Sequence, residues 1–338
     1  MASYLLALPL LFSFLVVLFL MPFWIKKVKS IGLVWDDLNK TLGEKVAGSG
    51  GVIVLLGFCL SCLAYVAYRV FNLGTKNGSL VEIFALLIIV LFMGFIGFID
   101  DLFGWRHGGL SVKSRFILTL VGSIPLIAIN AGRSSIGLPF FGVVDLGLIY
   151  PLFFIPLGIV ATTTTFNMFA GFNGLEAGQG AIMLSALALV AHFTGNSWLA
   201  VICLCFVFAL LGFLIYNWCP AKIFPGDAMT YAIGGLIAAV AIVGSFERIA
   251  VFFYIPYILE VILKLRGGLK KHSFGKPMKD GTIELLYDRV YSLNHVSIIL
   301  LKKMGIRPTE KRAVILLLTF QILIVVLGLV IFREGIFY

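Results

Sequence analysis

The sequence predicts an all-α, polytopic membrane protein that forms one integral-membrane domain over residues 1–338. Of its 338 residues, 61% are hydrophobic and only 12% are charged, and the mean hydropathy is +1.08. A chain of this composition cannot cover a water-soluble surface with polar groups, and it has no stretch polar enough to form a separate soluble domain. We therefore expect about ten transmembrane helices.

Apolar runs place these helices along the chain. The first run has no small-residue cleavage site and is too long for the core of a signal peptide, so it is interpreted as a membrane span. The sixth run (179–194) is short, and the eighth (228–245) and ninth (247–263) are closely spaced. Crossing a bilayer takes about 17–25 mainly apolar residues, and runs of that order lie at 4–25, 48–71, 80–99, 114–130, 146–166, 179–194, 198–217, 228–245, 247–263 and 313–332.

The distribution of basic residues predicts the orientation. With ten spans, one side receives 21 of the 26 Lys and Arg residues when its second loop is counted to residue 115, and the other side receives five, which include Lys76 and Arg133. The positive-inside rule makes the richer side cytoplasmic and places both termini outside. The net charge of +10 therefore reflects topology and a surface suited to anionic substrates and membrane lipids, not to nucleic acid. The predicted cytoplasmic loops are 26–47, 100–113, 167–178, 218–227 and 264–312.

Two adjacent carboxylates end the third apolar run. Asp100 and Asp101 follow it directly, and Lys113 lies beyond them. A desolvated carboxylate costs several kcal/mol unless it is paired or bound to metal. The pair fits a magnesium site that handles phosphates or, about equally well, a solvated helix end. Adjacent helical residues point about 100° apart, so the two carboxylates cannot bind one ion as equivalent ligands.

Glycines and a serine open the second predicted helix. Residues 48–51 follow the polar segment 36–40. Free N–H groups at such a helix start can bind a phosphate or a nucleotide. Close helix packing explains the same residues as readily.

Two asparagines, Asn167 and Asn173, lie where the fifth predicted helix ends. They are too far apart to share one helix face, and Gly171 and Gly174 predict that the helix unwinds into a loop. Irregular backbone at membrane depth is tolerated where it lines a polar cavity. The threonines at 162–165 are assigned to packing and to hydrogen bonds with their own helix.

A single carboxylate, Asp227, stands at the start of the eighth predicted helix, after Pro225 and Gly226. Taken alone, it is best interpreted as an N-terminal cap.

Read together, these polar segments resemble one family. The motifs resemble those of the polyprenyl-phosphate N-acetylhexosamine-1-phosphate transferases (glycosyltransferase family 4), and most closely the archaeal and eukaryotic UDP-GlcNAc:dolichyl-phosphate GlcNAc-1-phosphotransferases. The resemblance extends from about residue 36 to the last helix and includes a ten-helix plan. The matching motifs are DLNK at 37–40, FIDDL at 98–102, NMFAGFNGLEAGQ at 167–179 and PGD at 225–227.

The resemblance implies a transferase in a multi-pass membrane protein, with its active site at the cytoplasmic face. The phosphate of a polyprenyl or dolichyl phosphate attacks the β-phosphorus of UDP-GlcNAc and releases UMP. The product is polyprenyl-diphosphate-GlcNAc, made in the first committed step of lipid-linked glycan (N-glycan) synthesis. The alternative is the same chemistry with another UDP-HexNAc, for a cell-wall or surface polymer. The resemblance favours an archaeal cell membrane, or the ER membrane if the source is eukaryotic.

The resemblance also implies roles for individual residues. Asn167 and Asp227 match the ligands of Mg²⁺, for which Mn²⁺ is a substitute. Asp100, Asp101 and Lys113 match catalytic positions, and Lys113 is the phosphate-binding lysine. The implied substrate-binding residues are Asp36, Asp37, Leu38, Asn173 (against uracil), Arg266 and Lys271.

The chain departs from the family pattern in two places. Gly48 replaces an acid that eukaryotic members carry before the second helix. Of their arginine-rich motif, the sequence RGGLKK (266–271) keeps Arg266 and a terminal basic residue. We expect Arg266 and Lys271 to lie over the pyrophosphate, and 272–292 to form much of the sugar pocket. The histidine cluster of the bacterial peptidoglycan-precursor enzymes is absent, which argues against a muramyl-pentapeptide substrate.

A transporter of phosphorylated solutes is the rival class. It would show inverted repeats and charges near the bilayer midplane, whereas the charges here gather at one interface. Glu260 lies within the ninth run, where it can pair with Lys264 at i+4. A homodimer is compatible with the sequence, which does not decide the oligomeric state.

Overall fold

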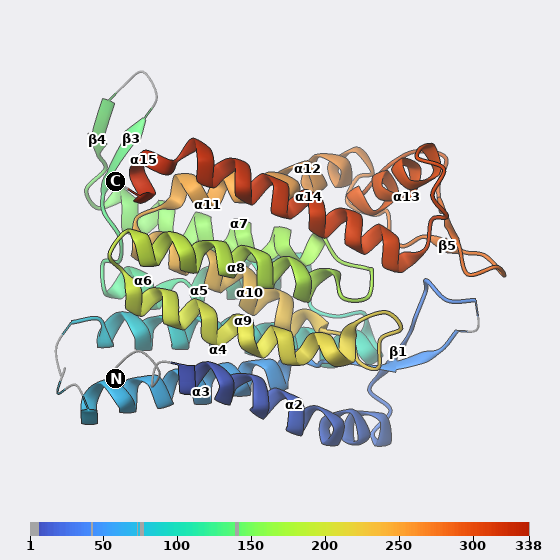
Figure 1. Cartoon of the computed structure of the whole chain (residues 1–338), viewed down its shortest axis with the longest axis horizontal. Coiled ribbons are helices and arrows are strands. Elements are labelled where there is room, and N and C mark those ends of the chain that lie inside the picture. Colours follow the sequence, from blue (N-terminus) through green and yellow to red (C-terminus); the bar gives the residue numbers. More distant parts are fainter. Residues whose placement is uncertain (1–6, 42, 73, 75–77, 139–141, 338) are drawn as a thin grey trace.

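The computed structural model describes residues 7–337 except 42, 73, 75–77 and 139–141. The helices lie roughly along one long axis (Figure 1). The described chain begins and ends at one end of this axis, with the start of α2 (Ala7–Ser30) and α15 (Arg333–Phe337), and β3 (Ser135–Leu138) and β4 (Gly142–Asp145) lie at that end too. The elements β1 (Val34–Asp36), β5 (Lys276–Pro277) and α13 (Leu293–Lys303) lie at the other end. This common position of the two ends agrees with an even number of crossings.

Among the described residues, eight helices are long and apolar enough to cross a membrane, so the chain is an integral membrane protein. The terminal helices α2 and α14 are only 22% and 28% buried over their most apolar windows, which leaves apolar side chains for lipid contact. The spans are α2 (Ala7–Ser30), α3 (Gly51–Asn72), α4 (Leu80–His107, spanning to Gly104), the π-helical turn η1 (Tyr150–Phe154) with α7 (Ile155–Met168), α8 (Leu175–Phe193), α9 (Ser197–Asn217), α10 (Gly226–Gly244) and α14 (Glu310–Ile331).

The two remaining predicted spans are not single helices. The segment expected at 114–130 divides into α5 (Val112–Val121) and α6 (Ile124–Ala128), and that at 247–263 divides into α11 (Glu247–Phe253) and α12 (Ile255–Arg266). Both second helices carry a proline in their first turn, where its missing N–H cannot continue the preceding ladder. Ten unbroken helices are therefore not confirmed.

Short hairpins add to the predicted all-helical plan. Each contains two antiparallel strands of two to four residues. Two further helices, α13 (Leu293–Lys303) and α15 (Arg333–Phe337), lie outside the spans. The strands are β1 (Val34–Asp36) with β2 (Lys45–Ala47), β3 (Ser135–Leu138) with β4 (Gly142–Asp145), and β5 (Lys276–Pro277) with β6 (Ile283–Glu284).

Helix α10 is the centre of the bundle. It packs against α3, α4, α7, α8 and α9, and 83% of its span is buried. Small residues allow the close approach: a Cβ at Gly97 would lie 2.2 Å from the Asp227 carbonyl oxygen, and one at Gly234 would lie 2.6 Å from Thr163 Cα. The first turn of α10 is thereby held against the end of α4, where the paired acids lie.

Candidate functional site

A pocket of about 420 Å³ opens among the polar loops at the β1 end of the bundle. All five loops predicted to be cytoplasmic contribute lining residues, so chain segments far apart in sequence meet here. The predicted site residues that line it are Asp36, Asp37, Leu38, Asp100, Asp101, Asn167, Asn173 and Asp227.

Asp100 and Asp101 point to different partners, as their helical offset predicts. Asp101 Oδ1 accepts a hydrogen bond from the Asp227 main-chain N–H (2.7 Å), and its Oδ2 accepts one from the Ser49 hydroxyl (2.9 Å). Asp100 Oδ1 accepts from Arg115 Nη2 at 3.0 Å. Arg115 Nε also lies 2.6 Å from Asp100 Oδ2, an ion pair poorly aligned for a hydrogen bond. The two carboxylates thus tie α4 to two different neighbours.

Asp227 does not cap its helix. The N-cap position of α10 belongs to Pro225, which makes no side-chain cap hydrogen bond, so the isolated cap interpretation is wrong. The Asp227 side chain instead interacts electrostatically with Asp100, Asp101 and Arg115. It is therefore part of a cluster of three acids that a helix N-terminus and one guanidinium partly compensate.

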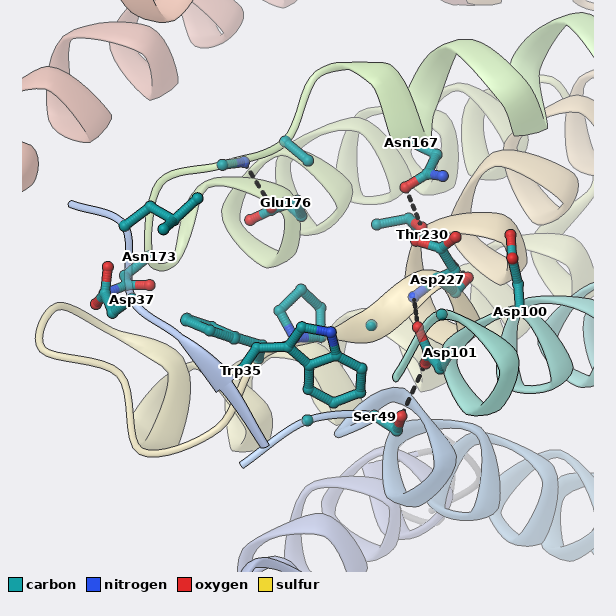
Figure 2. Close-up of a pocket in the computed structure, with 18 of the residues that line it drawn as sticks. Trp35, Asp37, Ser49, Asp100, Asp101, Asn167, Asn173, Glu176, Asp227 and Thr230 are labelled. Carbon is teal, nitrogen blue, oxygen red and sulfur yellow. Dashed lines mark hydrogen bonds between the residues drawn. The ribbon is translucent and has the colours of Figure 1, made fainter. Parts of the chain in front are cut away.

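Asn167 faces the same cluster from α7. Its side-chain oxygen lies 3.1 Å from the hydroxyl of Thr230, one turn beyond Asp227. Figure 2 shows Asn167, Thr230 and Asp227 together at one end of the pocket, beside Asp101. The Asp227 carboxylate and the Asn167 amide oxygen are hard oxygen donors of the kind that divalent cations prefer.

The opposite end of the pocket is built from amides and rings (Figure 2). Asn173 Nδ2 donates to Asp37 Oδ2 at 2.9 Å, and each of the two residues is only 4% exposed. Four aromatic rings, those of Trp35, Phe172, Phe224 and Phe274, line the pocket wall. This end offers fixed hydrogen-bonding groups and flat apolar surface, whereas the other end offers charge.

The loop that carries Asn173 has the predicted break. Helix α7 ends at Met168 and α8 begins at Leu175, and both Gly171 (φ 121°) and Gly174 (φ 86°) adopt conformations that favour glycine. The Glu176 carboxylate accepts a hydrogen bond from the Gly171 N–H at 3.0 Å and so closes the loop.

The preceding threonines bond to their own helix, as expected. The hydroxyls donate to carbonyl oxygens four residues earlier in three cases, Thr162, Thr164 and Thr165.

The glycines before α3 serve close packing. A Cβ at Gly48 would lie 1.7 Å from the Trp35 ring, and one at Gly51 would lie 2.4 Å from the Met229 nitrogen. Gly48 and Ser49 also line the pocket. The packing interpretation is therefore supported, and the Trp35 ring fills the space next to the position where eukaryotic members carry an acid.

Three basic residues of the predicted site, Lys113, Arg266 and Lys271, are not among the lining residues. Lys113 and Arg266 are exposed. The Lys271 ammonium lies 4.8 Å from the centroid of the Tyr287 ring. Arg115, two residues after Lys113, contacts the acids instead. The pairing expected between Glu260 and Lys264 is present, at 3.9 Å.

Several site residues escaped sequence reasoning. Arg115 carried a signal, since it is a second basic residue only two positions after Lys113. Thr230 carried a weaker one, because it lies one helical turn after Asp227. Asn39 carried a signal as part of the DLNK motif at 37–40, although its contact with Gly171 is 132 residues away. Glu310 gave none, because its partner Asn173 is 137 residues away.

Within the described part of the chain, no three or more His, Cys, Asp and Glu side chains form a metal-binding group. A cation held by Asp227 and Asn167 would need further oxygen ligands from water or substrate. That is the usual situation for Mg²⁺, which keeps several waters and is held by one or two carboxylates together with phosphates. The donor set therefore fits such an ion.

Comparison with known proteins gives consistent results over most of the chain. Residues 83–245 match the model of glycosyl transferase family 4. A Saccharolobus solfataricus protein, provisionally named UDP-N-acetylglucosamine–dolichyl-phosphate N-acetylglucosaminephosphotransferase, is 36% identical over 96% of this chain and 95% of its own length. The enzyme of that name from Dictyostelium discoideum is 27% identical over 67% of this chain and 63% of its own. A phospho-N-acetylmuramoyl-pentapeptide-transferase of Limosilactobacillus fermentum is 32% identical over 75% and 79%, respectively.

Proposed function

Because the chain belongs to glycosyl transferase family 4, we propose that it transfers GlcNAc-1-phosphate from UDP-GlcNAc to a polyprenyl or dolichyl phosphate, giving polyprenyl-diphosphate-GlcNAc and UMP. The observation that carries this proposal is the two-ended pocket. Its acidic end, around Asp101 and Asp227, suits phosphates that bind together with a divalent cation, and its amide and aromatic end, around Asn173, suits a nucleoside. The names of the relatives from Saccharolobus and Dictyostelium support the choice of sugar and lipid.

The proposal includes a membrane arrangement. We take α5–α6 and α11–α12 as two further spans, each interrupted near its proline, which makes ten. The pocket then opens at the cytoplasmic face, because the loops that line it belong to the side with 21 of the 26 basic residues. The lipid phosphate reaches the pocket from the membrane, and the nucleotide reaches it from the cytoplasm.

Magnesium is proposed as the cofactor, with Asp227 and Asn167 as its protein ligands and Mn²⁺ as a substitute. When bound, the ion neutralises phosphate charge at the reacting centre. Arg115, and the basic residues Lys113, Arg266 and Lys271 that the family resemblance indicates, add positive charge around it. Repulsion between two phosphate-bearing substrates in a low-dielectric cleft amounts to several kcal/mol, and these groups offset it.

The chemistry proposed is direct displacement. An oxygen of the lipid phosphate forms a bond to the β-phosphorus while the bond from that phosphorus to the UMP oxygen breaks. A phosphate monoester dianion is already a nucleophile at neutral pH, so the site needs no strong base. Asp101 serves to orient the first turn of α10, since both of its oxygens already accept hydrogen bonds from protein groups.

One experiment tests the function. Purified protein is incubated with Mg²⁺, polyprenyl phosphate and a panel of UDP-sugars, and UMP and lipid product are measured. UMP release that requires both lipid phosphate and UDP-GlcNAc supports the proposal. Preference for another UDP-HexNAc would change the assigned sugar but not the type of reaction. Uptake of a phosphorylated solute into vesicles without UMP release overturns it in favour of a transporter.

A further inference from the structure

Glu310 lies outside every segment to which the sequence analysis gave a role, yet it contacts three loops at the nucleoside end of the pocket. It is the first residue of α14 and is 4% exposed. Its Oε1 accepts a hydrogen bond from the Asn173 main-chain N–H at 2.8 Å and lies 3.4 Å from Asn39 Nδ2. Its Oε2 forms an ion pair with Lys40 and accepts from the Cys219 thiol at 3.2 Å. One carboxylate thus joins α14 to three separate loops.

The ion pair places the positive charge of Lys40 beside this carboxylate. Lys40 is partly buried, and burial alone would lower its pKa, but the Glu310 carboxylate outweighs this effect and leaves the pKa raised. A charged acceptor makes stronger hydrogen bonds to N–H groups than a neutral one does. The Asn173 main chain is therefore held firmly where its side chain lines the pocket.

Asp37 holds the side chain of the same asparagine. A carboxylate only accepts hydrogen bonds, so the Asn173 carboxamide must turn its NH₂ group toward Asp37 Oδ2. Asp37 is in turn fixed by the Asn39 main-chain N–H, which donates to its other oxygen at 3.0 Å. Asn39 also donates to the Gly171 carbonyl oxygen at 2.6 Å. The carboxamide consequently presents its oxygen and one remaining N–H in a single, fixed order.

We propose that Glu310 and Asp37 are positioning residues for base selection: they hold the Asn173 carboxamide so that the pocket pairs with the imide edge of uracil and rejects the amino-pyrimidine edge of cytosine. A carboxamide free to turn over pairs with either edge, because it exchanges its donor and its acceptor. A carboxamide that cannot turn over matches one order of donor and acceptor only. The inference rests on the proposed function, since it takes the donor to be a uridine nucleotide.

Product inhibition by UMP and by CMP measures this selection directly. The variants are Asp37→Asn, which keeps shape but can donate to Asn173, and Glu310→Ala, which removes the main-chain acceptor. Glu310→Gln is the conservative rescue, because its oxygen can still accept from the Asn173 N–H. Glu44→Ala, an exposed acid beside the same β-hairpin, is the matched control. Thermal unfolding in detergent shows whether each variant folds.

We expect the wild-type inhibition constant for CMP to exceed that for UMP by about tenfold or more, as an unpaired buried polar contact implies. Asp37→Asn should reduce this ratio to within about threefold, and Glu310→Ala should raise both the KM for the UDP-sugar and the inhibition constant for UMP. Glu44→Ala should stay close to wild type, and Glu310→Gln, whose neutral oxygen can still accept from the Asn173 N–H, should weaken nucleotide binding less than Glu310→Ala does. If Asp37 or Glu310 had a purely structural role, its substitution would lower thermal stability and weaken the binding of UMP and CMP equally.

Two outcomes overturn the inference while the proposed function stands. In the first, the wild type releases UMP from a UDP-sugar yet binds UMP and CMP equally. In the second, Asp37→Asn folds and keeps the full preference for UMP, which remains decisive even if Glu310→Ala fails to fold. Failure of the wild type to turn over any UDP-sugar would instead remove the proposed function itself.

Discussion

At the residue scale, the three clustered acids of the pocket differ in their partners. Asp100 and Asp101 are paired with other protein groups, whereas Asp227 mainly faces the other two acids. Both oxygens of Asp101 accept hydrogen bonds from protein groups, and Asp100 is paired with Arg115. Asp227 is surrounded by like charge. A third carboxylate in such a cluster is costly unless a cation joins it, so Asp227 is the residue through which a bound metal ion would stabilise the fold.

The first prediction follows from this. Asp227→Ala should lower kcat by about a hundredfold or more, because a metal contributes several kcal/mol of charge stabilisation. Thermal stability without Mg²⁺ should stay the same or increase, since the variant removes charge repulsion. Activity and melting temperature are measured with and without Mg²⁺. A variant that keeps Mg²⁺-dependent turnover at the wild-type rate would remove Asp227 from the site.

The second prediction separates two neighbouring cations. Arg115 contacts the buried Asp100, whereas Lys113 is exposed. Arg115→Ala should reduce kcat/KM by about ten- to a hundredfold, which is the loss of one charge-assisted contact, and Lys113→Ala should reduce it less. Parallel kinetics on the two variants decide the order. The reverse order would give Lys113 the phosphate-binding role that the family resemblance implies.

The residues that could be predicted from sequence share one property: they are polar groups where a hydrophobic run begins or ends. Asp100, Asp101, Asn167 and Asp227 were conspicuous for that reason. Glu310 was not, because an acid in the first turn of a helix is common and its partner Asn173 is 137 residues away. Long-range pairing of ordinary loop residues leaves no local pattern.

At the element scale, the long connection between α12 and α14 is attached to the bundle through buried polar groups. Glu260 Oε2 accepts from the Leu293 N–H at 2.7 Å, and Lys264 donates to the Lys271 carbonyl oxygen at 3.1 Å. Hydropathy predicted the helices on both sides but not this attachment, and it missed the breaks in α5–α6 and α11–α12 because a proline in an apolar run changes composition little. The attachment places one ring of this connection, Phe274, in the pocket wall.

The third prediction concerns Arg266, at the end of α12. It is exposed and outside the described pocket lining, yet the family resemblance places it over the pyrophosphate. Arg266→Ala should lower kcat/KM for UDP-GlcNAc by one to two orders of magnitude, the loss of about 1.5–3 kcal/mol from a charge-assisted phosphate contact. Lys303→Ala, another exposed basic residue of the same connection, is the control. Kinetics within about twofold of wild type would restrict the phosphate site to the surroundings of Arg115.

The fourth prediction is a dependence on pH. His295 Nδ1 accepts from the Tyr291 N–H and Nε2 faces the Phe274 carbonyl oxygen, both at 3.2 Å, so the neutral ring satisfies both neighbours. Burial lowers the His295 pKa below 6.5, although the Phe274 carbonyl opposes the shift, and Lys264 lowers it further. The unfolded state therefore binds a proton first as pH falls, and this contribution to stability is complete above about pH 6.5 and lost below it.

Thermal unfolding at pH 7.5 and 5.5 tests this contribution. The glutamine side chain introduced by His295→Gln does not titrate between pH 5.5 and 7.5. This variant should therefore lose less stability on acidification than the wild type. Equal losses in the two proteins would assign the pH dependence to other groups.

At the scale of the whole molecule, the chain brings five loops to one end of a bundle whose central helix is α10. Composition alone predicted a membrane bundle, and the distribution of charge predicted which loops share a side. Neither could predict that the pocket has two chemically different ends, because that depends on the way α4, α7 and α10 converge. Because the loops that line the pocket lie at one end of the bundle, they share one side of the membrane.

The fifth prediction is therefore the topology. Single cysteines are introduced at exposed positions in a background in which the five native cysteines are replaced, with serine at Cys219 to keep a hydroxyl beside Glu310. Positions in loops 26–47, 100–113 and 264–312 should react with a membrane-impermeant reagent only from the cytoplasmic side. Loop 167–178 is expected on the same side, although all of its residues are buried or half-buried. Arg133 should react only from outside, as should Lys76, which lies outside the described residues. The physical basis is the concentration of 21 of 26 basic residues on one side, since each is held back from translocation. External labelling of 264–312 would reverse the orientation, and a nucleotide made in the cytoplasm could then no longer reach the pocket.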